Sequence, residues 1–361
     1  MRLHARAAGA TALAKNIAIG IVALAVAGCS GGSTTTPTPP AGVQTASPQP
    51  SVSLATAATP TTTPTSAAVE AGRIAFGVKG ADGIPQIWSA GSNGTDLRQL
   101  TTGPGPNLCA TYSPDRKLIA YCSSAGGNFE IWTVSIEGTH QAQLTHLGGA
   151  ALFPNFSPDG RLIAFGGNQG NPEINQIEVV DATTGGSLQV LTNCTGQKPG
   201  CSNDFPAWSP DGRKIAFIHA DDFDAAGNPI NEQVWVMDAN GSHAHALTTD
   251  PARKDELPEW SPDGLLIAYA SGSDGSEGIW LMNADGSNPH QISGCAPADA
   301  APCASGSDFG PAWSPDGSQI AFLRDFSSLG QTDRPVWVMN ADGSAQHRLT
   351  AGPALQYVPA W

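Results

Sequence analysis

A tripeptide that recurs five times constrains the fold of this chain more than any other feature of its sequence. Ser-Pro-Asp stands at residues 113–115, 157–159, 209–211, 261–263 and 314–316, and an aromatic residue precedes each copy. Gly follows every copy except the first, where Arg116 stands. Each copy leads to Ile-Ala and an aromatic residue, and an extra Ile-Ala-Phe at 74–76 precedes the first copy. Self-similarity at a period of about fifty residues is typical of repeat architectures whose units pack side by side.

Two further signatures complete each unit. Leu-Thr or Ile-Ser ends the units, with the first residue at 100, 144, 191, 247, 292 and 349. Trp after Ile or Val precedes it in five units, at Trp88, Trp132, Trp235, Trp280 and Trp337, whereas one unit has Ile177-Glu178. Pro-Asp-Gly and Asp-Gly favour tight turns, so each unit predicts four short antiparallel strands. The 42 Gly, 29 Pro and only 13% charged residues favour short strands over long helices.

The ends of the repeat region predict how the ring closes. The first unit starts at its second strand, Ile74-Ala75-Phe76, and the chain ends on Val358-Pro359-Ala360-Trp361, which matches a first strand. The two ends complete one unit. We therefore expect an all-β, six-bladed beta-propeller whose C-terminal strand pairs into the N-terminal blade, because this pairing removes the free edges of an open ring.

The motifs W-S-P-D-G, I-A-F, I-W and D-G-S leading to L-T resemble the TolB-type beta-propeller repeat, over residues 73–361. The resemblance implies a non-catalytic scaffold of the bacterial envelope whose partner is an envelope protein or peptide. Oligogalacturonate lyases look similar in their repeats but rely on clustered His ligands for a metal. A carbohydrate-active enzyme of that kind, or a glycan-binding module, is the alternative.

The N-terminal region predicts export and lipid anchoring. Basic residues are followed by an apolar run at 17–28 that is too short to span a bilayer but suits a signal peptide. Val26-Ala27-Gly28-Cys29 resembles a bacterial lipobox, which implies lipidation of Cys29. We expect a signal peptide at 1–28, a lipidated Cys and Thr/Pro/Ser-rich disordered tether at 29–71, and the propeller at 72–361. The protein would lie on the periplasmic side of a membrane, or on the outer face of the plasma membrane where no outer membrane exists.

Charge narrows the range of partners. The chain has 31 acidic and 17 basic residues, a net charge of −14, and Arg2, Arg6 and Lys15 are the only charges before Glu70. The folded part is therefore strongly acidic, which excludes electrostatic binding of nucleic acid and leaves the lipid anchor as the only expected membrane contact. We expect a monomer.

Six cysteines besides Cys29 predict disulfides, as is typical of exported proteins. If Tyr112 opposes Ile119 across the Ser-Pro-Asp turn, Cys109 opposes Cys122 at a spacing that suits a bridge. The remaining four cysteines occur as two local pairs. We therefore predict disulfides between Cys194 and Cys201 and between Cys295 and Cys303. A zinc site is disfavoured, because no pair has the short C-x2-C spacing and no His accompanies them.

Other side chains carry weaker signals. All nine Trp lie on repeat signatures, which favours packing between blades, and each Asp of Ser-Pro-Asp is expected to be a turn residue. His146 and His219 lie near variable loops, whereas five other histidines fall at outer blade edges, namely His140, His243, His245, His290 and His347. No cofactor is expected.

Length variation predicts the binding face. The loops between second and third strands and between blades vary, and they lie at the end of the strands opposite the tight turns. Acidic residues recur there and form a candidate binding rim for a basic protein segment or a calcium ion: Asp204, Asp255, Glu256, Asp308, Asp221, Asp222 and Asp224. Asp222-Phe223-Asp224 followed by Gly227 partly matches the pattern of a calcium-binding loop. Asp222 and Asp224 are therefore the candidate calcium ligands.

Overall fold

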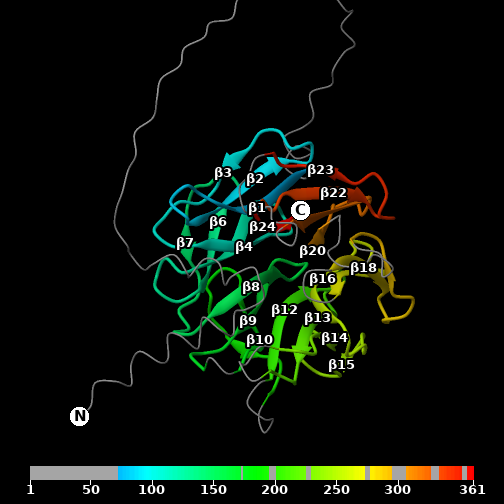
Figure 1. The fold of residues 1–361 in the computed structure, drawn as a ribbon. Helices are drawn as coiled ribbons and strands as arrows, with labels where there is room; N and C mark the ends of the chain where they lie inside the picture. The colour runs from blue at the N-terminus through cyan, green and yellow to red at the C-terminus, as the bar shows by residue number, and fades with distance from the viewer. Residues whose placement is uncertain are drawn as a thin grey trace, which may run out of the picture.

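Six sheets of four antiparallel strands each form a ring around a common centre (Figure 1), which confirms the expected six-bladed, all-β propeller. The computed structural model describes residues 72–171, 174–194, 201–224, 229–272, 277–294, 306–326, 333–351 and 356–361. The predicted signal peptide and tether, 1–28 and 29–71, lie outside the described residues. Within the described ranges, no helix is long and apolar enough to cross a membrane.

The first strand of each blade is the innermost, and the second pairs with it. The innermost strands are β4 (Asn107–Tyr112), β8 (Ala151–Phe156), β12 (Ser202–Trp208), β16 (Lys254–Trp260), β20 (Ser307–Trp313) and β24 (Gln356–Ala360). The second strands are β1 (Arg73–Lys79), β5 (Leu118–Ser123), β9 (Leu162–Gly167), β13 (Lys214–Ala220), β17 (Leu266–Gly272) and β21 (Gln319–Asp325).

The third and fourth strands complete each sheet toward the outside. The third strands are β2 (Pro85–Gly91), β6 (Glu130–Ser135), β10 (Gln176–Asp181), β14 (Gln233–Asp238), β18 (Gly278–Asn283) and β22 (Val336–Asn340). The fourth strands have two residues each: β3 (Arg98–Gln99), β7 (Ala142–Gln143), β11 (Gln189–Val190), β15 (His245–Ala246), β19 (His290–Gln291) and β23 (His347–Arg348).

The Ile-Ala-aromatic motif of the second strand packs one blade against the next. Successive side chains of a strand point to opposite faces, so Ile and the aromatic residue face one neighbour while Ala faces the other. Ala164 of β9 lies in one buried cluster with Ile215 and Phe217 of β13, and Ala268 of β17 lies with Ile320 and Phe322 of β21. The small Ala thus leaves room for the two large side chains of the following blade.

The Leu-Thr signature fixes the return of the chain after each fourth strand. In all six blades the Thr or Ser hydroxyl accepts a hydrogen bond from the backbone N–H of the third strand. The first and last examples are Thr101 with Ile87 at 2.9 Å and Thr350 with Val336 at 3.0 Å. The other acceptors are Thr145, Thr192, Thr248 and Ser293. The hydroxyl therefore satisfies a backbone donor that would otherwise be buried without a partner.

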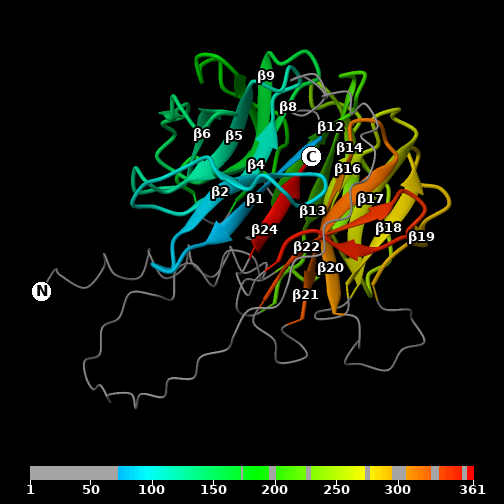
Figure 2. The same ribbon diagram turned by 90° about the horizontal axis from the view of Figure 1, so that it is seen from above.

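The ring closes as the chain ends predict. Strand β24, from the C-terminus, pairs with β1 through Ala360 with Ala75, Tyr357 with Gly77 and Gln356 with Val78. The two strands lie side by side in both Figure 1 and Figure 2. Without β24, the inner edge of β1 would expose unpaired N–H and C=O groups.

Two disulfides join the predicted partners. Cys109 is bonded to Cys122 and Cys194 to Cys201, with Cα–Cα distances of 5.6 and 5.7 Å. Tyr112 opposes Ile119 as expected, but the residue opposite Cys122 is Leu108, because the register shifts between Leu108 and Thr111. The expected register was therefore wrong by one residue at Cys109, although the pairing is confirmed. The third pair, Cys295 with Cys303, lies outside the described residues and stays a prediction.

Removal of residues 356–361 tests the closure. We expect the melting temperature of the full chain to fall by about 10 °C or more, since the first blade loses its inner strand and β1 gains a free edge. Trp361→Phe, which keeps the strand, is the matched control and should unfold close to the wild type. A truncated chain that melts with the control would overturn the closure.

Candidate functional site

A ring of tight turns forms the mouth of the candidate site. In each Ser-Pro-Asp turn the Ser hydroxyl donates to the Asp carboxylate, which also accepts a backbone N–H two residues later, as in Ser314, Asp316 and Ser318. These bonds hold the pKa of Asp316 at about 2 and lower that of the other four turn aspartates. The aspartates therefore serve the turns, as expected from the sequence.

Neighbouring turns also touch. The Gly after each Ser-Pro-Asp has a positive φ, 71° at Gly160, and the position of a Cβ there would lie 3.7 Å from Cδ of Pro114 in the preceding blade. Arg116 occupies the equivalent place in the first turn with a φ of 59°. Its guanidinium stacks 3.7 Å from the Tyr112 ring centre and donates to the backbone carbonyl of Arg73 at 2.9 Å.

A bulge in each inner strand redirects the chain at the centre of the ring. The register against the second strand shifts in all six blades, as between Glu256 and Glu259. Five bulge residues have positive φ: Cys109, Phe153, Phe205, Leu257 and Gly310. In five blades the next residue is Pro, which cannot donate to the strand ladder and so is tolerated at a bulge.

Gly310 is required where two inner strands approach most closely. The position of a Cβ on this residue would lie 3.0 Å from Cγ1 of Val358 in β24, and its φ is 64°. In two adjacent blades, the rings of Phe153 in β8 and Phe205 in β12 lie with their centres 4.0 Å apart. The bulges therefore bring the inner strands of different blades into contact, and one apolar cluster includes residues from all six.

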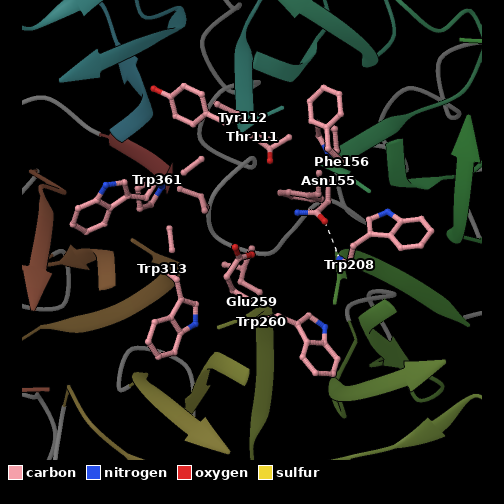
Figure 3. Close-up of a pocket in the computed structure, with 18 of the residues that line it drawn as sticks. Thr111, Tyr112, Asn155, Phe156, Trp208, Glu259, Trp260, Trp313 and Trp361 are labelled. Atoms are coloured by element: carbon pink, nitrogen blue, oxygen red, sulfur yellow. Dashed lines mark hydrogen bonds between the residues drawn. The ribbon is translucent and has the colours of Figure 1, made fainter. Parts of the chain in front are cut away.

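The turns and the bulges enclose a funnel of about 350 Å³ at the centre of the ring. All six inner strands line it, with aromatic residues, small residues and eight prolines, three of them from the turns at the mouth. Figure 3 shows Thr111, Asn155 and Glu259 at its centre, with the tryptophans around them. The funnel is near the lower end of the size range of ligand pockets, so it fits a side chain and a short stretch of backbone.

Glu259 is the distinctive residue of the funnel. It lies between Pro258 and Trp260, at the place that Ala207, Ala312 and Ala360 occupy in other blades. Among the described residues, none donates a hydrogen bond to its carboxylate or pairs with it as an ion. Glu259 is half-buried, and desolvation raises its pKa to about 7, because the surrounding apolar groups disfavour the charged form.

The other polar side chains of the funnel are either neutral or already bonded to neighbouring residues of the protein. Asn155 accepts a hydrogen bond from the backbone N–H of Trp208 at 2.9 Å, which leaves its amide hydrogens toward other partners. Among the described residues that line the funnel, Arg116 is the only one with a positive charge, and it contacts the Tyr112 ring and the Arg73 carbonyl. Glu259 therefore gives the funnel a negative character when it is ionised.

Three acids of the predicted rim lie inside the fold. Asp308 is fully buried, and the Arg324 guanidinium donates to both its oxygens at 2.6 and 2.7 Å. Asp255 is buried, with hydrogen bonds from Thr248 and Ser271. Asp204 accepts from Asn175 at 2.9 Å and from Ser202 at 2.8 Å. Burial raises the pKa of Asp204 and of Asp255, because desolvation disfavours their charged forms, whereas their hydrogen bonds join them to neighbouring residues of the fold.

The other acids of the rim are closer to solvent. Asp221, Asp222 and Asp224 are exposed, and Glu256 is half-buried. The Asn231 amide donates to Asp221 at 2.6 Å, which ties this loop to the start of the next strand. Within the described ranges no three His, Cys, Asp or Glu side chains converge as a metal site, and Gly227 of the calcium-like loop lies outside those ranges. The rim as a whole stays a prediction.

The histidines are dispersed, as the sequence indicates for the outer blade edges. The five expected at the edges are exposed, and so is His146. His219 is half-buried, where its Nδ1 lies 2.8 Å from the Asn203 side-chain oxygen and its ring lies 4.5 Å from that of Trp235. Burial lowers its pKa, which favours the neutral form.

The funnel opens on a different face from the one that loop length indicates. Its mouth is formed by Ser-Pro-Asp turn residues, whereas the variable loops lie at the other end of the strands. Sequence reasoning also missed Glu259. A signal was present, because Pro stands two residues before the closing aromatic residue in five inner strands, and only one of those five has an acid between them.

A closed ring of six four-stranded sheets around a central funnel defines the chain as a six-bladed beta-propeller. Residues 66–204 match the family model of the TolB beta propeller domain (PD40). This match covers less than half of the chain, so over residues 66–204 the chain is similar to the TolB-type propeller domain.

Sequence relatives match only part of the chain. The Tol-Pal system protein TolB of Anaeromyxobacter dehalogenans (strain 2CP-C) is 33% identical over 104 residues, 29% of this chain and 21% of the relative. The uncharacterized peptidase YuxL of Bacillus subtilis (strain 168) is 37% identical over 100 residues, 27% of this chain and 13% of the relative. The matches thus span about a fifth or less of these relatives.

Solved structures match more of the chain. TolB from Acinetobacter baumannii superposes with a TM-score of 0.63 at 21% identity, covering 80% of this chain and 66% of that chain. An oligogalacturonate lyase in complex with manganese gives a TM-score of 0.51 at 17% identity, covering 78% and 74%. At these identities the likeness shows the fold alone.

Glu259→Gln tests the electrostatics of the funnel. Since burial raises the pKa of Glu259 from 4.5 to about 7, its charge destabilises the fold above pH 7, and this penalty fades between pH 7 and 4.5 as the folded state takes up the proton. We expect the variant to be more stable than wild type by about 1–3 kcal/mol at pH 8 and equal to it below pH 4.5. Denaturant unfolding across this pH range measures the difference.

The exposed acid Glu137 provides the control, because Glu137→Gln removes one equal charge outside the funnel. Arg116 and Tyr112 are the other titratable groups that line the funnel, apart from the disulfide-bonded Cys109, and both variants retain them. If Glu259→Gln and Glu137→Gln show the same stability at every pH, the carboxylate of Glu259 is not desolvated.

Proposed function

We propose that this protein is a membrane-anchored lipoprotein of the bacterial envelope whose propeller is a non-catalytic protein-binding scaffold, and that its partner inserts a segment into the central funnel. The observation that supports the proposal is the funnel itself: all six blades contribute apolar walls, and among its described lining residues one, Glu259, supplies an unpaired carboxylate. Sites of this shape bind extended segments by apolar contact and select among them by a few polar groups.

Export has separate support. The two disulfides are typical of proteins that fold in an oxidising compartment, and the matched relatives include TolB proteins of the Tol-Pal system. Lipidation at Cys29 rests on the sequence, where small residues precede this Cys directly after an apolar run.

The oligogalacturonate-lyase alternative receives less support from the site. The resemblance implies clustered histidines as the metal ligands of such a lyase. Among the described histidines of this chain, five lie exposed at outer blade edges, His146 is exposed near a variable loop, and His219 lies beside Asn203. A glycan platform is also disfavoured, because Trp208, Trp260 and Trp313 are at least nine-tenths buried between blades and offer little ring face for stacking.

Photo-crosslinking in intact cells tests the scaffold. A benzophenone amino acid at Thr111, inside the funnel, should crosslink to one envelope protein, whereas the same group at exposed His347 on an outer edge should not. Ala360→Trp narrows the funnel without removing a polar side chain, so it should abolish the Thr111 crosslink while the melting temperature stays near that of wild type. Crosslinks that form from His347 only, or that persist with Ala360→Trp, would contradict the proposal.

Lipid anchoring is tested on its own. Cys29→Ala should abolish incorporation of a labelled fatty acid and release the chain from membranes, because the thiol is the expected site of acylation. Cys295→Ala, which removes a different thiol, is the control and should remain labelled. A Cys29→Ala chain that keeps both the label and the membrane association would contradict lipid anchoring through Cys29.

A further inference from the structure

The funnel contains a carboxylate, that of Glu259, among walls that are mainly apolar. Glu259 faces the centre of the ring from β16, where three other blades place Ala and two place the neutral Thr111 and Asn155. Placing a carboxylate among prolines and aromatic rings costs stability unless a partner compensates it. Among the described residues no such partner is present, so the carboxylate can pair with a group that a ligand brings.

The one cation among the described residues that line the funnel already has other contacts. Arg116 lines the same funnel, but its guanidinium lies 3.7 Å from the Tyr112 ring centre and donates to the Arg73 carbonyl at 2.9 Å. These contacts also hold the first turn in the conformation that Gly adopts in the other four turns. Releasing Arg116 toward Glu259 would break both contacts, so the carboxylate stays available to a ligand.

The chemistry of the site narrows the ligand further. A calcium ion takes six to eight oxygen ligands, whereas the funnel supplies one carboxylate. An organic cation on an apolar stem fits both features, since its methylene groups can contact the prolines while the charged end reaches the acid. The rings that line the funnel also favour a cation.

We propose that Glu259 is the specificity-determining residue of the funnel and that it selects a segment of the partner protein carrying one Lys or Arg side chain, which enters the funnel and pairs with the carboxylate. Asn155, whose side-chain oxygen is held by the Trp208 N–H, keeps its amide hydrogens for a carbonyl of the same segment. This inference rests on the proposed scaffold function and adds the chemical class of the segment to it.

Selection of random peptides tests the pairing without knowledge of the natural partner. A phage library of nine-residue random peptides is selected at pH 8 for binding to the full wild-type chain in detergent. Phages that also bind the Ala360→Trp variant are then discarded, so that the remaining peptides depend on an open funnel. We expect the surviving sequences to share one Lys or Arg. A resynthesised peptide with norleucine in place of that residue should bind wild type about tenfold to a hundredfold more weakly.

The same peptides are then measured on variants of the protein. Glu259→Gln should bind the Lys and norleucine peptides about equally, Glu259→Asp should retain part of the preference, and Glu137→Gln should match wild type. Because the preference is a ratio between two peptides on one variant, a general loss of stability does not mimic it.

The outcomes separate the inference from the function on which it rests. Funnel-dependent peptides without a basic residue, or a Lys preference that survives in Glu259→Gln, overturn the cation subsite and leave the scaffold intact. A selection that yields no peptide sensitive to Ala360→Trp overturns the funnel as the binding site, and the cation subsite with it.

Discussion

The pairing of β24 with β1 is the contact on which the rest of the molecule depends. Each blade presents an inner and an outer edge, and five blades obtain their inner strand from the segment directly before their second strand. The first blade obtains it from the other end of the chain, so the ring exists only when residues far apart in sequence meet. This pairing also completes the funnel, because Val358, Pro359, Ala360 and Trp361 line it.

The bulges convert a ring of sheets into a site. A regular inner strand would alternate its side chains between the two faces of its own sheet. The bulge shifts this alternation, and the positive φ with the following Pro turns the residue before the closing aromatic toward the centre. The walls are therefore set by a bulge that all six blades share, whereas the chemistry depends on one variable side chain in each blade.

The fold was predictable from the sequence because its signatures are local. Ser-Pro-Asp, Ile-Ala-aromatic and Leu-Thr each make contacts within a blade or with its neighbour, so their recurrence gave the number of blades and the closure. The site was less predictable. Asp255 and Asp308 were assigned to a rim from their place before the first strands, but they face buried partners, Thr248 and Arg324 among them. Linear spacing does not reveal that the register shifts two residues later, and the same shift accounts for the error at Cys109.

Two kinds of negative charge then act at different ranges. The exposed acids of a chain with net charge −14 attract a basic partner over about a Debye length, and salt screens this attraction. Glu259 lies inside the funnel, where the dielectric is lower and the carboxylate acts only after a segment has entered. In the proposed complex, the exposed acids would therefore govern the rate of encounter, whereas Glu259 would govern how long a correct segment stays, since charges across a buried contact mainly change dissociation. In this proposal, a segment without a cation would meet the same acidic surface but leave the carboxylate unpaired in the occupied funnel, and this cost would give the funnel its selectivity.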